Sequence, residues 1–271
     1  MRAAAFVDTL SALQSEVADQ LGSTVSETVV HLAGSEREFK TLTQDRIPHW
    51  GIGVAYPQAK TIVLKYRPGQ TASLLQTARH EFSHILLHHV LAESGNRVPV
   101  WFNEGVAMWV GREWRLHQSF DVALAVFRDG LIPLRDVDAV LAFGATRAQL
   151  AYDQSYLAVL FILSRAGDDA IPDLIAEVAE GTPFPVAIYR LTGLSPEVFE
   201  SEFAAFVADR FGLGAVVTSG EAIWFYIVVL FLTVWVGVRR RNQRTFDRWE
   251  EEDPLEGLPL KLRAKINRER Q

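Results

Sequence analysis

The chain has 271 residues, of which 49% are hydrophobic and 22% charged, and its formal net charge is −6. This length and composition suit one well-packed domain with an appendage, and the negative charge disfavours nucleic acid as a partner. Because the sequence has no cysteine, disulfides and thiolate metal sites are excluded, and histidines and carboxylates are left as metal ligands.

Residues 1–24 are expected to form an amphipathic N-terminal helix. Their apolar residues recur at helical spacing, at Phe6, Leu10, Leu13, Val17 and Leu21. The apolar run at 3–7 ends at Asp8, short of the ~7–15 apolar residues of a secretory signal. We therefore expect a helix that docks on the rest of the fold, in preference to an anchor on a membrane surface.

The stretch 27–66 is expected to form a small sheet. Glu27–Ala33 has the composition of a strand, and a short helix capped by Ser35 follows it up to Leu42. Ile52–Tyr56 and Thr61–Tyr66 are typical of a hairpin pair joined by residues 57–60. The sheet would be antiparallel or mixed.

The segment Leu74–Val90 has apolar residues at helical spacing and carries the motif H-E-F-S-H at 80–84. His80 and His84 are four residues apart, so both imidazoles can reach one ion. Glu81 is offset by about 100°, near enough to contact a water at that ion without binding the ion itself. Two imidazoles and such a carboxylate are the parts of a zinc hydrolase. The alternative is a helix with two surface histidines beside a glutamate.

A catalytic zinc site needs a third protein ligand and one open position. One known arrangement would place a glycine at 87 and a histidine at 90, but the residues there are Leu87 and Val90. A second helix offers Glu104, which lies 20 residues after His84, with Gly105 beside it to let the two helices approach. The alternative for Glu104 is a solvated carboxylate, which is favourable near a helix N-terminus.

The motifs H-E-F-S-H at 80–84 and W-F-N-E-G at 101–105 resemble those of the gluzincin clan of metallopeptidases, which includes thermolysin. The closest resemblance is to bacterial peptidase MA-like domains, over about residues 25–212. It implies a zinc metallopeptidase with one Zn²⁺ per chain, bound by His80, His84 and Glu104, and with Glu81 as general base. The sequence departs from thermolysin at Met108, where an acidic residue would orient a zinc histidine.

The same resemblance implies two further parts of the site. A strand before the zinc helix would pair with the substrate backbone, and either Gly51–Tyr56 or Thr61–Lys65 can do so. An ordinary sheet strand is the alternative. A tyrosine would donate to the oxyanion, and Tyr152 and Tyr156 are four apart on the expected helix 147–165. Tyr152 is the preferred catalytic residue, with simple aromatic packing as the alternative.

The remaining sequence up to residue 212 is predicted to be mainly helical, with helices at 101–115, 119–128, 147–165, 170–180, 184–191 and 196–211. The last begins at Pro196 after the cap Ser195. The predicted fold class is α+β: a small N-terminal sheet, then a mainly helical lobe, with the zinc helix between them. Together they form one domain over residues 25–212.

Residues 222–238 form a run of 17 residues without a charge and are predicted to be a single transmembrane helix. Tryptophans and a tyrosine lie near its ends and Arg239–Arg241 follow, so the positive-inside rule places the charged tail 239–271 in the cytoplasm and the catalytic domain outside. The missing export signal conflicts with this. A true start further upstream, export without a cleaved signal and a cytoplasmic enzyme remain the alternatives, and a buried core helix is the alternative for the run itself.

Together these features predict a membrane-anchored zinc metallopeptidase whose partners are a peptide or protein substrate and the lipid bilayer. The alternative is a non-catalytic, zinc-stabilised membrane scaffold or partner-binding domain. The substrate's identity and the oligomeric state are not specified by the sequence.

Overall fold

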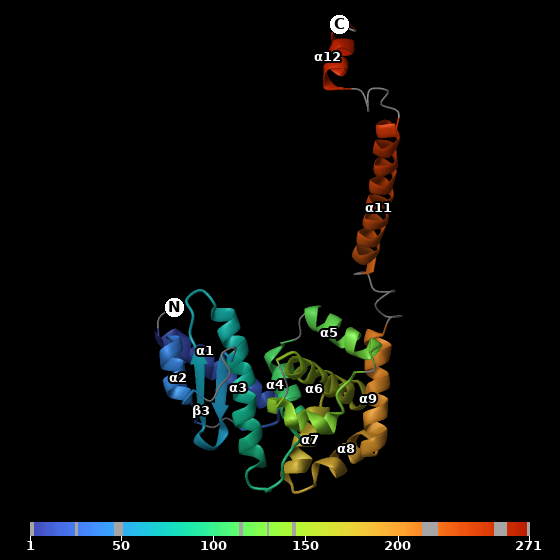
Figure 1. Cartoon of the computed structure of the whole chain (residues 1–271). Coiled ribbons are helices and arrows are strands. Elements are labelled where there is room, and N and C mark those ends of the chain that lie inside the picture. The colour runs from blue at the N-terminus through green and yellow to red at the C-terminus, as the bar shows by residue number, and fades with distance from the viewer. Residues whose placement is uncertain are drawn as a thin grey trace. The chain divides into compact units, whose positions relative to one another are not determined.

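The computed structural model describes residues 3–24, 27–45, 51–113, 116–128, 130–142, 145–212, 222–251 and 259–269. The chain divides into two units, Met1–Ala215 and Val216–Gln271 (Figure 1). Residues 213–221 lie outside the described part, so the domain boundaries expected at 212 and 222 stay a prediction.

A mixed sheet lies in the N-terminal part of the first unit. Its order is β1 (Val29–Ala33), β3 (Thr61–Lys65), β2 (Gly53–Tyr56). β3 pairs parallel with β1 and antiparallel with β2. The buried apolar side chains of β3, among them Ile62 and Leu64, suit this central place. The expected small mixed sheet is confirmed, and its hairpin turns through η1 (Pro57–Ala59).

Helices make up most of the first unit, as the sequence predicts. They are α1 (Ala3–Gln20), α2 (Glu36–Thr43), α3 (Thr71–Leu91), α4 (Val100–Gly111), α5 (Leu116–Phe127), α6 (Ala145–Ala166), α7 (Ala170–Ala179), α8 (Phe184–Thr192) and α9 (Pro196–Phe211). Side-chain caps at Ser35 and Ser195 begin α2 and α9. The 3₁₀ segment η2 (Leu134–Ala142) was not predicted.

The apolar stripe of α1 is part of the main core. Leu10, Leu13 and Val17 are buried in the same cluster as Phe82 and Leu86 of α3. α1 therefore packs on α3 through its apolar face.

α4 lies between α3 and α6, and glycine makes its contact with α6 close. A Cβ added at Gly105 would lie 2.2 Å from the backbone oxygen of Ser155. From the sequence, Gly105 was expected to let α4 approach α3, and this expectation is wrong. Gly105 is one residue, about 100°, further around α4 than Glu104, which faces α3.

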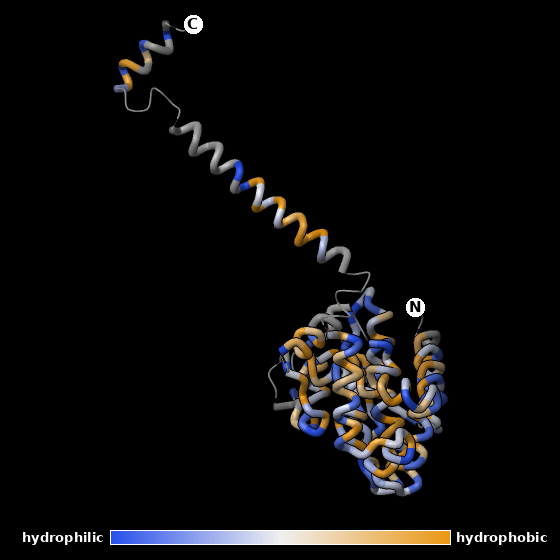
Figure 2. The backbone as a smooth tube through the Cα atoms, turned by 90° about the vertical axis from the view of Figure 1, so that its right-hand side faces the viewer, coloured by the Kyte–Doolittle hydropathy of each residue, from blue (hydrophilic) through white to orange (hydrophobic). Residues whose placement is uncertain are grey.

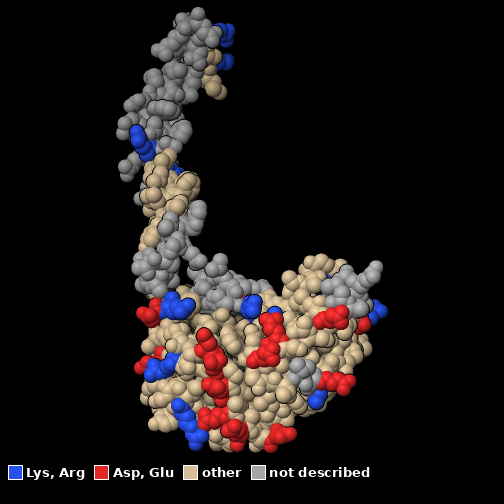
Figure 3. All heavy atoms as spheres, turned by 180° about the vertical axis from the view of Figure 1, so that it is seen from behind, with Lys and Arg blue, Asp and Glu red and all other residues tan. Residues whose placement is uncertain are grey.

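Charged side chains of both signs are interspersed on the face of the molecule shown in Figure 3. Exposed ion pairs include Lys40–Asp45 at 3.2 Å and Arg165–Glu202 at 3.9 Å. Pairs of this kind contribute about 0–1 kcal/mol each, so the apolar core provides most of the stability.

The second unit contains α11 (Ala222–Glu251) and α12 (Leu260–Glu269). In the described part of the chain, no helix combines the length and apolar character needed to cross a membrane. The predicted transmembrane helix at 222–238, and with it the single-pass localisation with an outside catalytic domain and a cytoplasmic tail, is wrong. Its 17 uncharged residues give about 25 Å of helix, against about 30 Å of hydrocarbon. Figure 2 shows a hydrophobic stretch in α11 followed by a short hydrophilic one. In the sequence the uncharged run ends at Val238 and Arg239 follows.

Candidate metal centre

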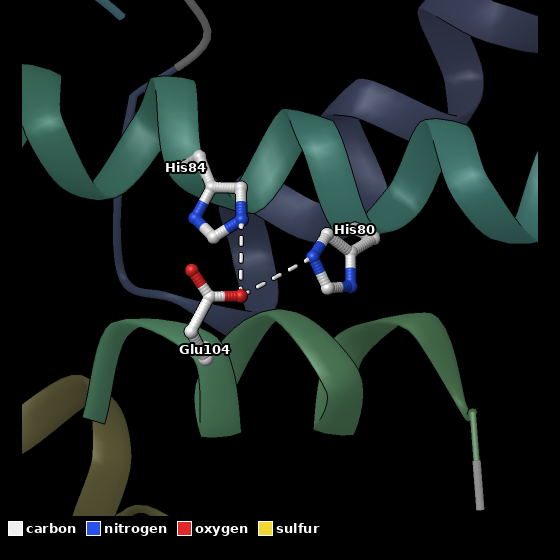
Figure 4. A group of neighbouring side chains, drawn as sticks. All are labelled: His80, His84 and Glu104. Atoms are coloured by element: carbon white, nitrogen blue, oxygen red, sulfur yellow. Dashed lines mark ion pairs between the residues drawn. The ribbon is translucent and has the colours of Figure 1, made fainter. Parts of the chain in front are cut away.

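The histidines of the H-E-F-S-H motif face the second helix that carries Glu104. His80 and His84 extend from α3 and Glu104 from α4, and one ligand atom from each lies within 4.8 Å of the others (Figure 4). Glu104 Oε2 is 3.7 Å from His80 Nε2 and 3.8 Å from His84 Nε2. The tertiary fold thus brings the three predicted ligands together.

The apolar residues of both helices produce this orientation. On α3, Phe82, Ile85 and Leu86 are buried in the core, so the histidines occupy the remaining face. On α4, Phe102 and Val106 are fully buried. The side chains of His80, His84 and Glu104 keep 16%, 12% and 19% of their exposure, so the cluster is only partly buried.

The donor set fits a zinc ion. Two imidazole nitrogens and one carboxylate oxygen are common ligands of catalytic zinc, with bonds of about 2.0–2.2 Å. In a tetrahedral arrangement such ligand atoms stand about 3.3–3.6 Å apart. Here Glu104 Oε2 is 3.7 and 3.8 Å from the two histidines, and the three ligand atoms lie within 4.8 Å of one another. These separations are too long for direct hydrogen bonds, so small side-chain movements toward a shared ion would satisfy all three groups.

The Nδ1 atom of each histidine has an oxygen nearby. Asn103 Oδ1 lies 3.1 Å from His84 Nδ1, and Glu113 Oε1 lies 3.0 Å from His80 Nδ1. With Nδ1 toward these oxygens, both Nε2 atoms are directed at Glu104. Neither partner was predicted from the sequence. Asn103 stands inside the second motif beside Glu104, a signal that was available, whereas Glu113 follows the end of α4 and has no spacing that marks it.

Charge within the cluster suits a cation between the three side chains. Burial by itself lowers the pKa of His80, but Glu113, Glu104 and Glu81 outweigh it and raise that pKa well above its usual value. Burial raises the pKa of Glu104, but the two histidines outweigh it and the net shift is downward. A proton on His80 and a metal ion would therefore compete for the same place.

Glu81 is buried beside the cluster, with 7% of the residue exposed. Burial raises its pKa, and the two histidines only partly oppose this. A carboxylate whose pKa is raised toward neutrality is suited to accept a proton and return it.

The edge strand β2 reaches Glu81 through a glycine. A Cβ added at Gly53 would lie 2.8 Å from Glu81 Oε1 and 2.5 Å from Thr77 Cγ2. Of the two strands considered for substrate pairing, Thr61–Lys65 corresponds to the central strand β3 and pairs on both sides. This leaves β2, an edge strand of the sheet, for that role.

The two candidate tyrosines lie in different surroundings. Burial, then the charges of Glu104 and Glu81, raise the pKa of Tyr152 to about 12. Burial raises the pKa of Tyr156, but the charge that acts on it is that of Arg210 on α9. The charges of Glu104 and Glu81 therefore act on the Tyr152 phenol, and this phenol keeps its proton at neutral pH.

Comparison with known proteins identifies a family match over the region that contains this site. A family model described as the Peptidase MA superfamily matches residues 36–209, more than half of the chain and inclusive of the whole cluster. A Bacillus subtilis (strain 168) protein described as the uncharacterized protein YhcO is 24% identical over 130 residues, which cover 46% of this chain and 38% of that protein. The chain thus matches well under half of that relative's length.

Proposed function

The chain belongs to the Peptidase MA superfamily, and we propose that its first unit is a zinc-dependent metallopeptidase that hydrolyses peptide bonds. One observation carries the proposal: His80, His84 and Glu104 form a half-buried cluster, and the buried carboxylate of Glu81 lies next to it. A peptidase-like activity is the family's general expectation, whereas the zinc mechanism rests on this cluster.

Three side chains would hold the ion. His80 and His84 would bind it through Nε2, since their Nδ1 atoms lie next to Glu113 and Asn103, and Glu104 would supply a carboxylate oxygen. When bound, zinc lowers the pKa of a water molecule and polarises the carbonyl under attack.

Glu81 is the proposed general base. It would take a proton from the attacking water and pass it to the leaving amine nitrogen, which a carboxylate with a raised pKa can do in both directions. Its burial also keeps bulk water from competing for that proton.

Tyr152 is the proposed oxyanion donor. Burial and the nearby carboxylates raise its pKa to about 12, so its phenol is protonated and can donate at neutral pH, as an ordinary tyrosine also can. A hydrogen bond from it would stabilise the negative charge that develops on the scissile carbonyl oxygen.

The substrate would be an extended peptide laid along β2. An edge strand can add a strand from another chain by backbone hydrogen bonds. Because Gly53 leaves no room for a Cβ beside Glu81, a peptide on β2 would pass close to the general base.

The test combines zinc content with hydrolysis of a mixed peptide library by the full chain. We expect about one zinc per chain, weaker zinc binding in Glu104→Ala, and full zinc content in Glu81→Gln with activity lower by about 10²–10⁴-fold. Glu177→Gln, which changes a carboxylate paired with Arg190, is the control and should match the native chain.

Two results would reject the proposal. If the folded native chain binds no zinc, the cluster is not a zinc site. If the zinc-loaded native chain and the Glu81→Gln variant have equal peptidase activity, or if neither has any, the result would favour a non-catalytic domain that is zinc-stabilised or binds a partner.

A further inference from the structure

Glu113 lies just beyond the end of α4, and the chain turns back there. Arg112 takes the left-handed conformation, with φ of 52°. The backbone N–H of Glu113 then donates to the carbonyl of Met108 at 3.1 Å, which is the closing bond of a Schellman-type helix end. This turn returns the Glu113 side chain toward α4 instead of into solvent.

Gly111 provides the space that the returning side chain occupies. A Cβ added at Gly111 would lie 2.9 Å from Oε1, 3.1 Å from Cγ and 3.3 Å from Cδ of Glu113. The Glu113 side chain therefore lies directly over Gly111, and from there its Oε1 reaches His80 Nδ1 at 3.0 Å.

Contacts from two other helices support this turn. Gln76 of α3 donates from Nε2 to the backbone oxygen of Arg112 at 2.9 Å. Glu16 of α1 forms an ion pair with Arg112 at 3.5 Å and another with Arg79, the residue before His80. α1 precedes the residues matched by the family model, which begin at 36, so part of this support comes from outside the matched region.

We propose that Glu113 is the positioning residue for His80, and that Gly111 is the position that makes this possible. Glu113 Oε1 stands 3.0 Å from His80 Nδ1, although the two groups are not aligned for a hydrogen bond. A small rotation of the Glu113 side chain would let it accept the Nδ1–H of His80, which leaves the Nε2 lone pair directed toward Glu104. A carboxylate behind a zinc histidine fixes the ring and raises its basicity. Glu113 performs from beyond the helix end the task that Met108, buried and apolar, cannot perform. The inference rests on the proposed zinc site.

The test measures zinc affinity by competition with a chelator, together with the urea unfolding of the metal-free full chain. Loss of such a partner weakens metal binding by about 10–100-fold, and we expect this for Glu113→Ala. Glu113→Gln, which keeps an acceptor oxygen, should recover part of the loss.

Gly111→Ala separates positioning from a purely structural role. Its Cβ would displace only the flexible end of Glu113, while alanine favours the helix. We therefore expect metal-free stability to be retained and zinc affinity to fall about as far as in Glu113→Ala. The double variant should bind no more weakly than Glu113→Ala alone, since both changes remove one interaction.

Two control variants match these changes. Glu177→Ala alters an ion-paired carboxylate with 26% side-chain exposure, against 27% for Glu113. Gly237→Ala alters a helical glycine with open space around it. Both should bind zinc as the native chain does.

The outcomes distinguish this inference from the proposed function. If the native chain binds zinc and Glu113→Ala and Gly111→Ala bind it within about twofold, the positioning role is wrong and the zinc site stands. If the folded native chain binds no zinc, the proposed function fails and this inference fails with it.

Discussion

Replacement of Gly105 by alanine should destabilise the first unit and weaken the metal site together. The new Cβ would stand 2.2 Å from the backbone oxygen of Ser155 and 2.8 Å from a methyl of Val159, where ordinary contact begins at 3.4 Å. Because the nearest atom belongs to the backbone of α6, no side-chain rotation relieves the clash. α4 and α6 must therefore separate by about 1 Å.

The size of the effect follows from two opposing terms. Overpacking of this kind costs about 1–3 kcal/mol, and the upper end applies where backbone must move. The better helix propensity of alanine returns about 1 kcal/mol, so a net loss of about 2 kcal/mol is expected. A shift of about 1 Å in α4 also exceeds the roughly 0.5 Å within which a site must be held, so Glu104 should bind zinc less tightly.

The assay is urea unfolding of the full chain in the presence of a chelator, with tryptophan fluorescence as the readout. With an m-value of about 2 kcal/mol per molar, the midpoint should fall by about 1 M. Gly237→Ala, a helical glycine with no neighbour within 4 Å, should leave the first unit's midpoint unchanged. An unchanged or higher midpoint for Gly105→Ala would refute the argument that this glycine sets the approach of α4 to α6.

Three further changes have defined expectations. Tyr152→Phe should lower kcat by about 10²–10³-fold with KM and zinc content unchanged, because it removes only the proposed oxyanion donor. Phe102→Ala should lower the free energy of unfolding in urea by about 3–5 kcal/mol, because the ring is fully buried and lies in α4 two residues before Glu104. Glu16→Gln should destabilise the chain more at pH 6 than at pH 3. The hydrogen bond from Arg79 outweighs burial and lowers the pKa of Glu16 below its usual 4.5, so its stabilisation is present above that value and lost as pH falls through the lowered pKa.

Each of these has a control and a contrary result. Tyr156→Phe should keep native kcat, and an equal loss in both tyrosine variants would show a packing effect instead of an oxyanion contact. Phe127, with 65% exposure, should tolerate alanine, and a Phe102→Ala loss no larger than the Phe127→Ala loss would contradict the core placement. For Glu16→Gln, an equal loss at both pH values would show that ionisation of this carboxyl does not stabilise the fold.

Local spacing was sufficient to predict most of the elements and the candidate ligands. A four-residue interval places His80 and His84 on one helical face whatever surrounds them, and the apolar period of α3 indicates which face is buried. The caps at Ser35 and Ser195 act within one turn, so they too can be read along the chain. Glu104 could be proposed because a third ligand was needed and its motif could be matched.

The remaining features depend on contacts between elements, which spacing does not encode. Only strand order places β2 at an edge and β3 in the centre, and only helix packing shows that Gly105 faces α6. The run at 222–238 had the composition of a membrane helix but too little length once α11 continued into charged residues. Glu113 reaches His80 because Arg112 turns the chain back and Gly111 leaves space. The sequence thus determined which residues can bind a metal, while the tertiary structure decided what surrounds and orients them, because those contacts join segments far apart along the chain.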